Sequence, residues 1–570
     1  MSGTTRRSRA PIDTSGGRPP TPAAFTTARR VVASSGLLPM LQGRLDHMVG
    51  RPRSLSVEGL LVAMQVNALR RHHQATLAEV ARVLNSFTDT QREELGIRNW
   101  KPAQAYDRAN QLFNSLNGEL EAGWEVTIDG TTTRIDVAWF ADRLLEASLG
   151  DVPTWSRSRA VDGTDIDTWG KLHGELDDTD FDGDEDAQPD ESTSRRNRRV
   201  KRSRHARILG VGPDGRNIYT KDPDARAGHR SATGSRAAGL GVGYELHTAV
   251  LARDAGWSNG IDRLNVGPDV PPVITTISLV PAGSRRDDAI VPKLIADKAG
   301  GFDIDDVVWD RGYSQLRPEN TNHPLSRAGI QTTFRPKDTQ RAAKPFSEDA
   351  LLIEGHLVSS HVPRELRRLL PMPPMKSSAE ESARYEEEFN LLAQYRFERN
   401  GRPDADGATR WRCPICAGRL RSRQVPRSMR GSRNRPLVAL PDGAACCNGA
   451  VTASAAELPH WQRFLPGTTA WRISYGRRQV VEGVNAMLKG GFVNIQHKFF
   501  RVFGLAKMTL LLAFTLAGYN LEAIRSFTAK KEAERTAAPP KRTRKKRRTG
   551  TWTDVIGSER PESGRSPPPG

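Results

Sequence analysis

Residues 304–315, IDDVVWDRGYSQ, decide the fold, because a short apolar run there ends in a carboxylate and then in a turn. The apolar residues at 307–309 predict a buried strand, and Asp310 stands at its end, before Gly312 breaks the strand. A carboxylate directly after an apolar run is costly to bury unless it is paired or binds a metal ion. Asp310 is therefore a candidate site residue. Three further carboxylates precede the strand and are expected in a solvated loop: Asp303, Asp305 and Asp306.

The sequence around this strand predicts a mixed α/β core. Short β-like runs precede it at 124–128, 133–139, 158–162, 206–211, 243–251 and 273–280. A helix-like stretch follows them at 287–299, and the strand that ends in Asp310 comes next. Strands followed by a strand–helix–strand pattern are typical of a sheet flanked by helices. We place the first part of this core at 124–340 and its end at 471–528, with helices at about 475–489 and 503–525.

The chain before this core is expected to be helical. Residues 1–40 are rich in Ser, Pro, Gly and Arg, which predicts a disordered basic arm. The stretch 76–84, TLAEVARVL, opens with Thr and Glu in capping-box spacing. Further helical patterns cover about 90–96 and 103–121. The unit at 41–123 is either a DNA-end-binding domain of helix-turn-helix type or a plain helical bundle.

Two inserts and a tail are set apart from the core by composition. Ten of the seventeen residues at 175–191 are acidic and eight of the thirteen at 195–207 are basic, so 175–207 is expected to be a charged, flexible loop. A second insert, 341–470, separates Asp310 from the last helices. The tail, 529–570, is expected to be disordered and basic.

Composition narrows the class of protein. The chain has 85 Lys and Arg against 66 Asp and Glu, a formal net charge of +19 and a pI near 10.1. Such an excess favours a polyanionic partner such as nucleic acid, although ribosomal and membrane-surface proteins share it. No stretch of signal-peptide type opens the chain, and the longest apolar run, 508–517, is too short to span a bilayer. With only four cysteines in 570 residues, a soluble protein of a reducing intracellular compartment is expected.

A second candidate carboxylate lies in SRAVDGTDIDTW, residues 158–169. An apolar approach ends in Asp162, and Gly163 is expected to turn the chain so that the carboxylate stands at a strand end. Asp165 and Asp167 are competing candidates, and Asp167 is the less suited because it lies two pleats further along. An aspartate in an ordinary Asp-Gly turn is the alternative without a function.

A third candidate lies in YGRRQVVEGVNAMLKG, residues 475–490. On one helix Arg478, Glu482 and Lys489 would share a face, because they are spaced by four and seven residues. Val481 and Val484 belong to the apolar side that would pack on the sheet. The face would place one carboxylate between two cations, which suits a metal ion beside phosphates. A surface ion pair between Arg478 and Glu482 is the alternative.

The spacing Tyr-x2-Arg-x3-Glu-x6-Lys, at Tyr475, Arg478, Glu482 and Lys489, resembles the motif around the catalytic glutamate of a large group of bacterial insertion-sequence transposases. These belong to the Asp-Asp-Glu (DDE) superfamily and have a ribonuclease-H-like core. The sequences VDGT at 161–164 and VVWDRGYS at 307–314 are similar to the strands that carry the two aspartates of that group. The resemblance covers about 158–525, including the long insert.

The resemblance implies a site and its ligands. Asp162, Asp310 and Glu482 would be the catalytic residues and would hold two Mg²⁺ ions, or Mn²⁺, for in-line displacement at phosphorus. Tyr475 would contact a phosphate or a strand, and Arg478 and Lys489 would hold the backbone of the transposon end. In relatives a tryptophan of the insert stacks on a flipped base, and three are possible counterparts: Trp411, Trp461 and Trp471.

The four cysteines indicate a second kind of site. Cys413 and Cys416 have the spacing of half a zinc ribbon, but Cys446 and Cys447 are adjacent, which breaks the usual second knuckle. A structural zinc ion and a set of reduced cysteines in a small β-rich insert are both consistent with this pattern.

Three functions follow in order. The resemblance implies a transposase that binds terminal inverted repeats of double-stranded DNA, cleaves and transfers strands, and acts as a homodimer in the synapse, in the bacterial cytoplasm at the nucleoid. A transposase-derived DNA-binding regulator without catalysis is the second reading. A metal-dependent nuclease without strand transfer is the third.

Overall fold

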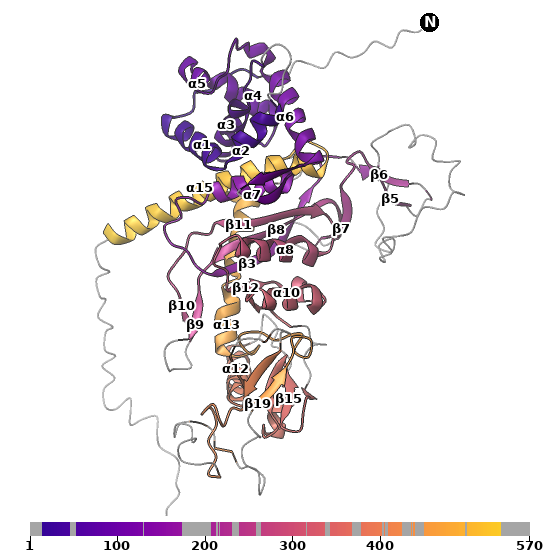
Figure 1. Ribbon diagram of the computed structural model, residues 1–570, viewed down its shortest axis with the longest axis vertical. Coiled ribbons are helices and arrows are strands. Elements are labelled where there is room, and N and C mark those ends of the chain that lie inside the picture. Colours follow the sequence, from indigo (N-terminus) through magenta and orange to yellow (C-terminus); the bar gives the residue numbers. More distant parts are fainter. Residues whose placement is uncertain are drawn as a thin grey trace, which may run out of the picture. The chain divides into compact units, whose positions relative to one another are not determined.

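A computed structural model shows how the chain folds (Figure 1). It describes the residues 14–45, 53–128, 130–170, 172–173, 207–211, 215, 217–230, 239–257, 264–314, 316–336, 343–367, 378–401, 404, 408–424, 435, 437–438, 450–495 and 499–536. The charged loop expected at 175–207 lies outside these residues, except for Arg207 at the start of a strand.

Helices occupy the N-terminal region and begin earlier than the sequence suggested. The expectation of a disordered arm to residue 40 is wrong beyond residue 21, because α1 (Pro22–Ser34) and α2 (Leu37–Leu45) are formed there. The Thr21 side chain caps α1, and a proline opens it, as helix starts favour. Phe25, Ala28 and Val32 follow at helical spacing and are buried. A basic composition hid this apolar stripe.

The remaining N-terminal helices lie where the apolar spacing predicts them. They are α3 (Val57–Ala68), α4 (Leu77–Ser86), α5 (Asp89–Glu94), the short η1 (Pro102–Gln104) and α6 (Ala105–Ala122). The Thr76 side chain accepts a hydrogen bond from the backbone of Glu79, so it is the N-cap of α4. The chain changes to β-structure at Trp124, in the hairpin of β1 (Trp124–Ile128) and β2 (Thr131–Ile135). The strand expected at 133–139 is wrong in its second half, because Asp136 caps α7 (Val137–Ala147).

A six-stranded mixed sheet forms the centre of the fold. Its order is β11–β8–β3–β12–β13, and β7 also pairs with β8. The strands are β3 (Ser158–Asp167), β7 (Arg226–Arg230), β8 (Gly239–Ala252), β11 (Ile274–Pro281), β12 (Asp306–Trp309) and β13 (Gln331–Thr333). The pairs β3–β8, β8–β11 and β7–β8 are antiparallel, whereas β3–β12 and β12–β13 are parallel. The expected mixed α/β fold class is confirmed at this level.

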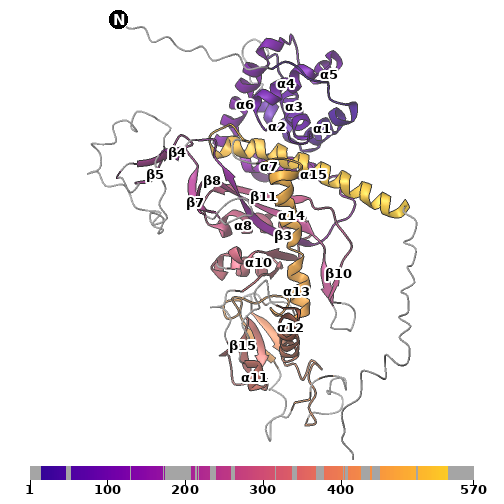
Figure 2. The ribbon, with the colours of Figure 1, turned by 180° about the vertical axis from the view of Figure 1, so that it is seen from behind.

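Helices cover both faces of the sheet, because neighbouring strand residues point to opposite sides. Ala160 and Val250 belong to one hydrophobic cluster, together with residues of α14 (Gln479–Ala486) and α15 (Leu505–Thr536). Val161 and Ala249 belong to another, together with α8 (Arg286–Ala299). Figure 2 shows α14 on the side of the sheet opposite the view of Figure 1. The sheet is thus the middle layer of a three-layer core.

Smaller elements surround the sheet. Two small sheets are β4 (Leu172–His173) with β6 (Asn217–Thr220) and β5 (Arg207–Val211), and β9 (Ala255–Trp257) with β10 (Leu264–Val266). Short helices follow β12: α9 (Arg311–Ser314), η5 (Pro318–Asn320) and α10 (Asn322–Arg327).

The insert between β13 and the last helices has a hydrophobic cluster of its own. Phe389, Trp411 and Leu465 are among its buried members. Its elements are β14 (Ala343–Pro345), β15 (Ala350–Ile353), β16 (His356–Ser359), α11 (Arg364–Arg367), α12 (Ala379–Gln394), β17 (Glu398–Asn400), β18 (Thr409–Arg412) and β19 (Ala450–Ala453). They include two three-stranded antiparallel sheets, β14–β15–β16 and β17–β18–β19.

The C-terminal helix is longer than expected. α15 runs to Thr536, so the predicted disorder from residue 529 is wrong for its first eight residues. Ion pairs such as Lys531 with Glu534, at 2.9 Å, support this last part of the helix. The basic run at 541–548 lies outside the described residues. Within the described part of the chain, no helix combines the length and apolar character needed to cross a membrane.

Candidate active site

Asp162 lies in the middle of β3, which continues to Asp167. The expected turn at Gly163 is therefore wrong, since Gly163 stays in the strand and pairs with His247 of β8. The Gly163 backbone N–H donates to Asp162 Oδ1 over 2.9 Å, and the Asn485 side-chain amide of α14 donates to Oδ2 over 3.1 Å. Asp162 thus faces the helix that carries Glu482.

Asp310 lies beside Asp162 because of strand register. β12 is parallel to β3, and Trp309 pairs with Val161. The next residue of each strand is a carboxylate, so the two aspartates stand at the same level on adjacent segments. Trp309 is fully buried and stacks on the ring of Tyr313 at 5.5 Å, which fixes the end of β12.

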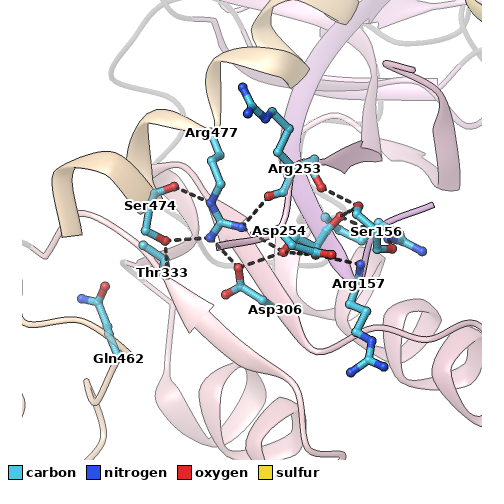
Figure 3. Close-up of polar contacts among 12 residues, drawn as sticks. Ser156, Arg157, Arg253, Asp254, Asp306, Thr333, Gln462, Ser474 and Arg477 are labelled. Carbon is cyan, nitrogen blue, oxygen red and sulfur yellow. Dashed lines mark hydrogen bonds and ion pairs between the residues drawn. The ribbon is translucent and has the colours of Figure 1, made fainter. Parts of the chain in front are cut away.

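Glu482 is brought to the aspartates by α14. Arg478, at the N-terminus of this helix, pairs with Glu482 Oε1 at 2.6 Å and with Asp310 Oδ1 at 3.6 Å. The predicted i,i+4 pair is therefore present, but its arginine also reaches a second strand-borne carboxylate. A surface ion-pair ladder would not do this. Figure 3 shows the neighbouring polar contacts at the junction between α13 and α14.

The carboxylates influence one another electrostatically. Burial, and then the charge of Asp310, raise the pKa of Asp162 to about 6, and Glu482 raises it further in the same direction. The Gly163 N–H and the Arg478 guanidinium act against this rise. An additional positive charge beside Asp162 would therefore be favourable at neutral pH.

The donor chemistry of this group fits a hard divalent cation. Three carboxylates converge from two strands and a helix, and hard cations such as Mg²⁺ prefer oxygen ligands. The uncompensated charge on buried Asp162 is what such an ion would neutralise. Across the part of the chain that the structure describes, no three His, Cys, Asp or Glu side chains lie close enough together to hold a metal ion. In this arrangement Arg478 is paired with Asp310 and Glu482, so an ion would require these side chains to adjust.

The single helix expected at 475–489 is wrong. The chain forms α13 (Thr469–Gly476), then α14, then a π-helical turn at Met487–Gly491. A π turn has wider spacing than an α-helix, so the seven-residue interval to Lys489 is not two α-helical turns. Lys489 pairs with Asp165 of β3 at 3.1 Å. Asp165, the rival to Asp162, is thus held by the lysine of the motif.

Tyr475 and the three tryptophans differ in accessibility. Tyr475 stacks on Trp471 at 4.9 Å, and Arg478 lies 5.5 Å from its ring centre. The Trp471 indole N–H donates to the Phe334 carbonyl over 3.2 Å, and the ring is buried. Trp411 and Trp461 meet edge to face at 5.6 Å and line a cavity of about 520 Å³ between the insert and α10. They are the tryptophans that border open space.

The cysteine site is described only in part, because Cys446 and Cys447 lie outside the described residues. Cys413 is buried and disulfide-bonded, and Cys416 is a free thiol. The Ile415 N–H points at Cys413 Sγ over 3.4 Å. Zinc binds thiolates, so a four-cysteine zinc site requires the reduced chain.

Two site residues were missed by the sequence analysis, Arg477 and Asp306. Asp306 was expected in a solvated loop but is 2% exposed and pairs with Arg477 at 2.5 Å. Arg477 stands four residues before Val481 and seven before Val484, in line with the apolar stripe of the motif. That position was the available signal that this arginine faces the core.

Comparisons of this chain with models of known families, with curated proteins and with solved structures find no match.

Proposed function

We propose that this chain is a transposase of the Asp-Asp-Glu superfamily with a ribonuclease-H-like core, acting on DNA by metal-dependent phosphoryl transfer. The strand order β11–β8–β3–β12–β13, with three antiparallel strands followed by two parallel ones, supports this core. The positive net charge supports a polyanionic substrate.

One observation carries the proposal. Asp162 and Asp310 lie at the same level of adjacent parallel strands, and Arg478 joins Asp310 to Glu482 of α14. These three carboxylates come from 162, 310 and 482, far apart in sequence, and meet where the sequence motifs separately predicted a site. An accidental ion pair on one helix would not bring in the strands.

Each residue has a role in the proposal. Asp162, Asp310 and Glu482 would hold two Mg²⁺ or Mn²⁺ ions, which when bound lower the pKa of the attacking water or 3′-hydroxyl and stabilise the leaving oxygen. Asn485 orients the Asp162 carboxylate through its 3.1 Å hydrogen bond. Arg478 and Lys489 would turn from their carboxylate partners to DNA phosphates, and the Tyr475 ring would support Arg478.

The partners follow from the same reaction. Double-stranded transposon ends and target DNA would be the substrates, and a homodimer would hold the two ends in the synapse. The protein would work at the nucleoid in the bacterial cytoplasm. A structural zinc ion on Cys413, Cys416, Cys446 and Cys447 is part of the proposal for the reduced protein.

The test is a cleavage assay. The purified protein is incubated with DNA carrying the segments that border its gene, with Mg²⁺ or Mn²⁺, and nicked and joined products are measured. We expect both products, and their loss in D310A and E482Q with DNA binding kept. Binding without cleavage would favour a regulator, and cleavage without joining would favour a nuclease. Cleavage that survives D310A would refute the assigned site.

A further inference from the structure

Arg477 lies at the junction of α13 and α14 and is almost completely enclosed, with 4% of its side chain exposed. Its guanidinium group donates to two main-chain carbonyls, two hydroxyls and one carboxylate (Figure 3). The acceptors are the Ser474 carbonyl at 3.0 Å and its Oγ at 2.7 Å, Ser158 Oγ at 2.9 Å, the Arg253 carbonyl at 2.9 Å and Asp306 Oδ2 at 2.5 Å.

The partners of Arg477 stand at fixed distances along the chain from the three carboxylates. Ser158 begins β3, four residues before Asp162, and Asp306 begins β12, four residues before Asp310. Ser158 and Asp306 are paired in the parallel register, and their side chains hydrogen-bond at 3.3 Å. Arg477 therefore grips both strands at one level, and both carboxylates lie about 13 Å further along, at a rise of about 3.3 Å per residue.

The same contacts fix the start of α14. The Arg477 backbone N–H donates to the Ser474 carbonyl over 3.2 Å, and Ser474 Oγ lies 3.4 Å from Thr333 Oγ1 of β13. Glu482 follows Arg477 by five residues on a continuous helix. One buried guanidinium thus joins the strand of each aspartate to the helix of the glutamate.

Stability alone does not explain this arrangement. A buried ion pair gains little over well-packed apolar side chains, because both charges lose their hydration. Among the described residues, no donor reaches the second carboxylate oxygen of Asp306. An arginine offers five donors in a planar fork, which a lysine cannot reproduce. The group is suited to fixing the relative position of several segments.

We infer that Arg477 is a positioning residue that sets Glu482 against Asp162 and Asp310. The inference rests on the proposed function of those carboxylates. It goes beyond that function because Arg477 touches none of the three and would act only through Ser158, Asp306 and the start of α14.

The experiment compares R477M and R477K with a matched control, N520A. Asn520 is also buried and makes three hydrogen bonds, to the backbone of Ile274 and to Ser148, but it joins α15 to β11 and α7. The readouts are the melting temperature, Mn²⁺ affinity by calorimetry without DNA, and kcat and KM for cleavage of the bordering DNA. R477M leaves Asp306 without its partner, so R477M/D306L, which removes both charges, is measured as well.

We expect R477M to lower kcat about 100-fold, the effect of a small misplacement of reacting groups, with a smaller change in KM. Mn²⁺ affinity should fall in R477M and in the double variant, even where the latter regains its melting temperature. R477K should recover only part of the affinity, and N520A should keep both affinity and kcat.

Results of other kinds would overturn the inference. If R477M and N520A lose affinity and kcat equally at equal loss of melting temperature, Arg477 is only structural. The same conclusion follows if R477M/D306L regains full Mn²⁺ affinity. If the wild-type protein cleaves no DNA but binds Mn²⁺, the proposed function fails, and the affinities still decide on Arg477. If it neither cleaves nor binds Mn²⁺, both fail.

Discussion

Replacing Asp162 with asparagine is expected to stabilise the metal-free protein at neutral pH and to abolish strand cleavage. The substitution keeps the size of the side chain and the acceptor for the Gly163 N–H. The second oxygen becomes an amide donor that faces Asn485. Asn485 Oδ1 is buried, and among the described residues no donor reaches it, so a rotation of that amide would provide an acceptor.

The magnitude follows from the pKa of Asp162. Burial and the neighbouring Asp310 raise this pKa from 3.8 to about 6. Each pKa unit corresponds to about 1.4 kcal/mol, so ionised Asp162 costs the folded state up to about 3 kcal/mol at pH 7.5. A raised carboxyl pKa means that the folded protein holds this proton more tightly than the unfolded chain does. The Asp162 contribution to stability therefore grows as the pH falls from about 6 towards 3.8.

The assay is urea unfolding in EDTA at pH 7.5 and pH 4. D162N should have a free energy of unfolding about 1–3 kcal/mol above the wild type at pH 7.5, and most of this difference should be gone at pH 4. D165N is the matched control, because Asp165 and Lys489 are each more than a third exposed and such a pair contributes less than about 1 kcal/mol. D165N should also keep cleavage. A D162N protein that is less stable than the wild type at pH 7.5, or equally favoured at both pH values, would refute the reasoning.

Three further predictions concern other parts of the molecule. N520A should lower the free energy of unfolding by about 2 kcal/mol, because the backbone N–H and carbonyl of Ile274 lose their partner, and an unchanged urea midpoint would contradict this. Burial lowers the pKa of His73 to about 4, so the folded state resists its protonation and stability is lost as the pH falls from 6.5 to 4. H73Q should remove about 3 kcal/mol of that loss in unfolding titrations, and parallel pH profiles of variant and wild type would argue against it. The reduced protein should bind one zinc ion by metal analysis and C416S much less, whereas equal zinc contents would exclude Cys416 as a ligand.

Much of the central sheet could be predicted from the sequence because apolar runs and their ends are local signals. The strand at 306–309 and the helix at 286–299 lie within one residue of the patterns that predict them. Helix α1 was missed because Arg29 and Arg30 and the preceding polar residues mask a short apolar stripe. The turn expected at Gly163 was wrong because β8 provides a long partner for β3 on that side.

The candidate site could be predicted as a set of residue types but not as a network. The spacing of Arg478 and Glu482 predicted their contact, which the structure contains. The contact between Arg478 and Asp310 depends on strand register and helix placement, which no local pattern encodes. Asp306 was misassigned for the same reason, since its partner Arg477 lies 171 residues away.

This separation has a consequence for the chain during its synthesis. When Asp310 leaves the ribosome, both aspartates exist but neither α14 nor the arginine that joins the strands to it has been made. At about 5–20 residues per second, translation from Asp310 to Glu482 takes roughly 10–30 s. The insert, with a hydrophobic cluster of its own, is completed in this interval. A nascent or prematurely terminated chain would therefore be inert towards the DNA from which it is being transcribed, and the ability to cut would arise only once nearly the whole protein is complete.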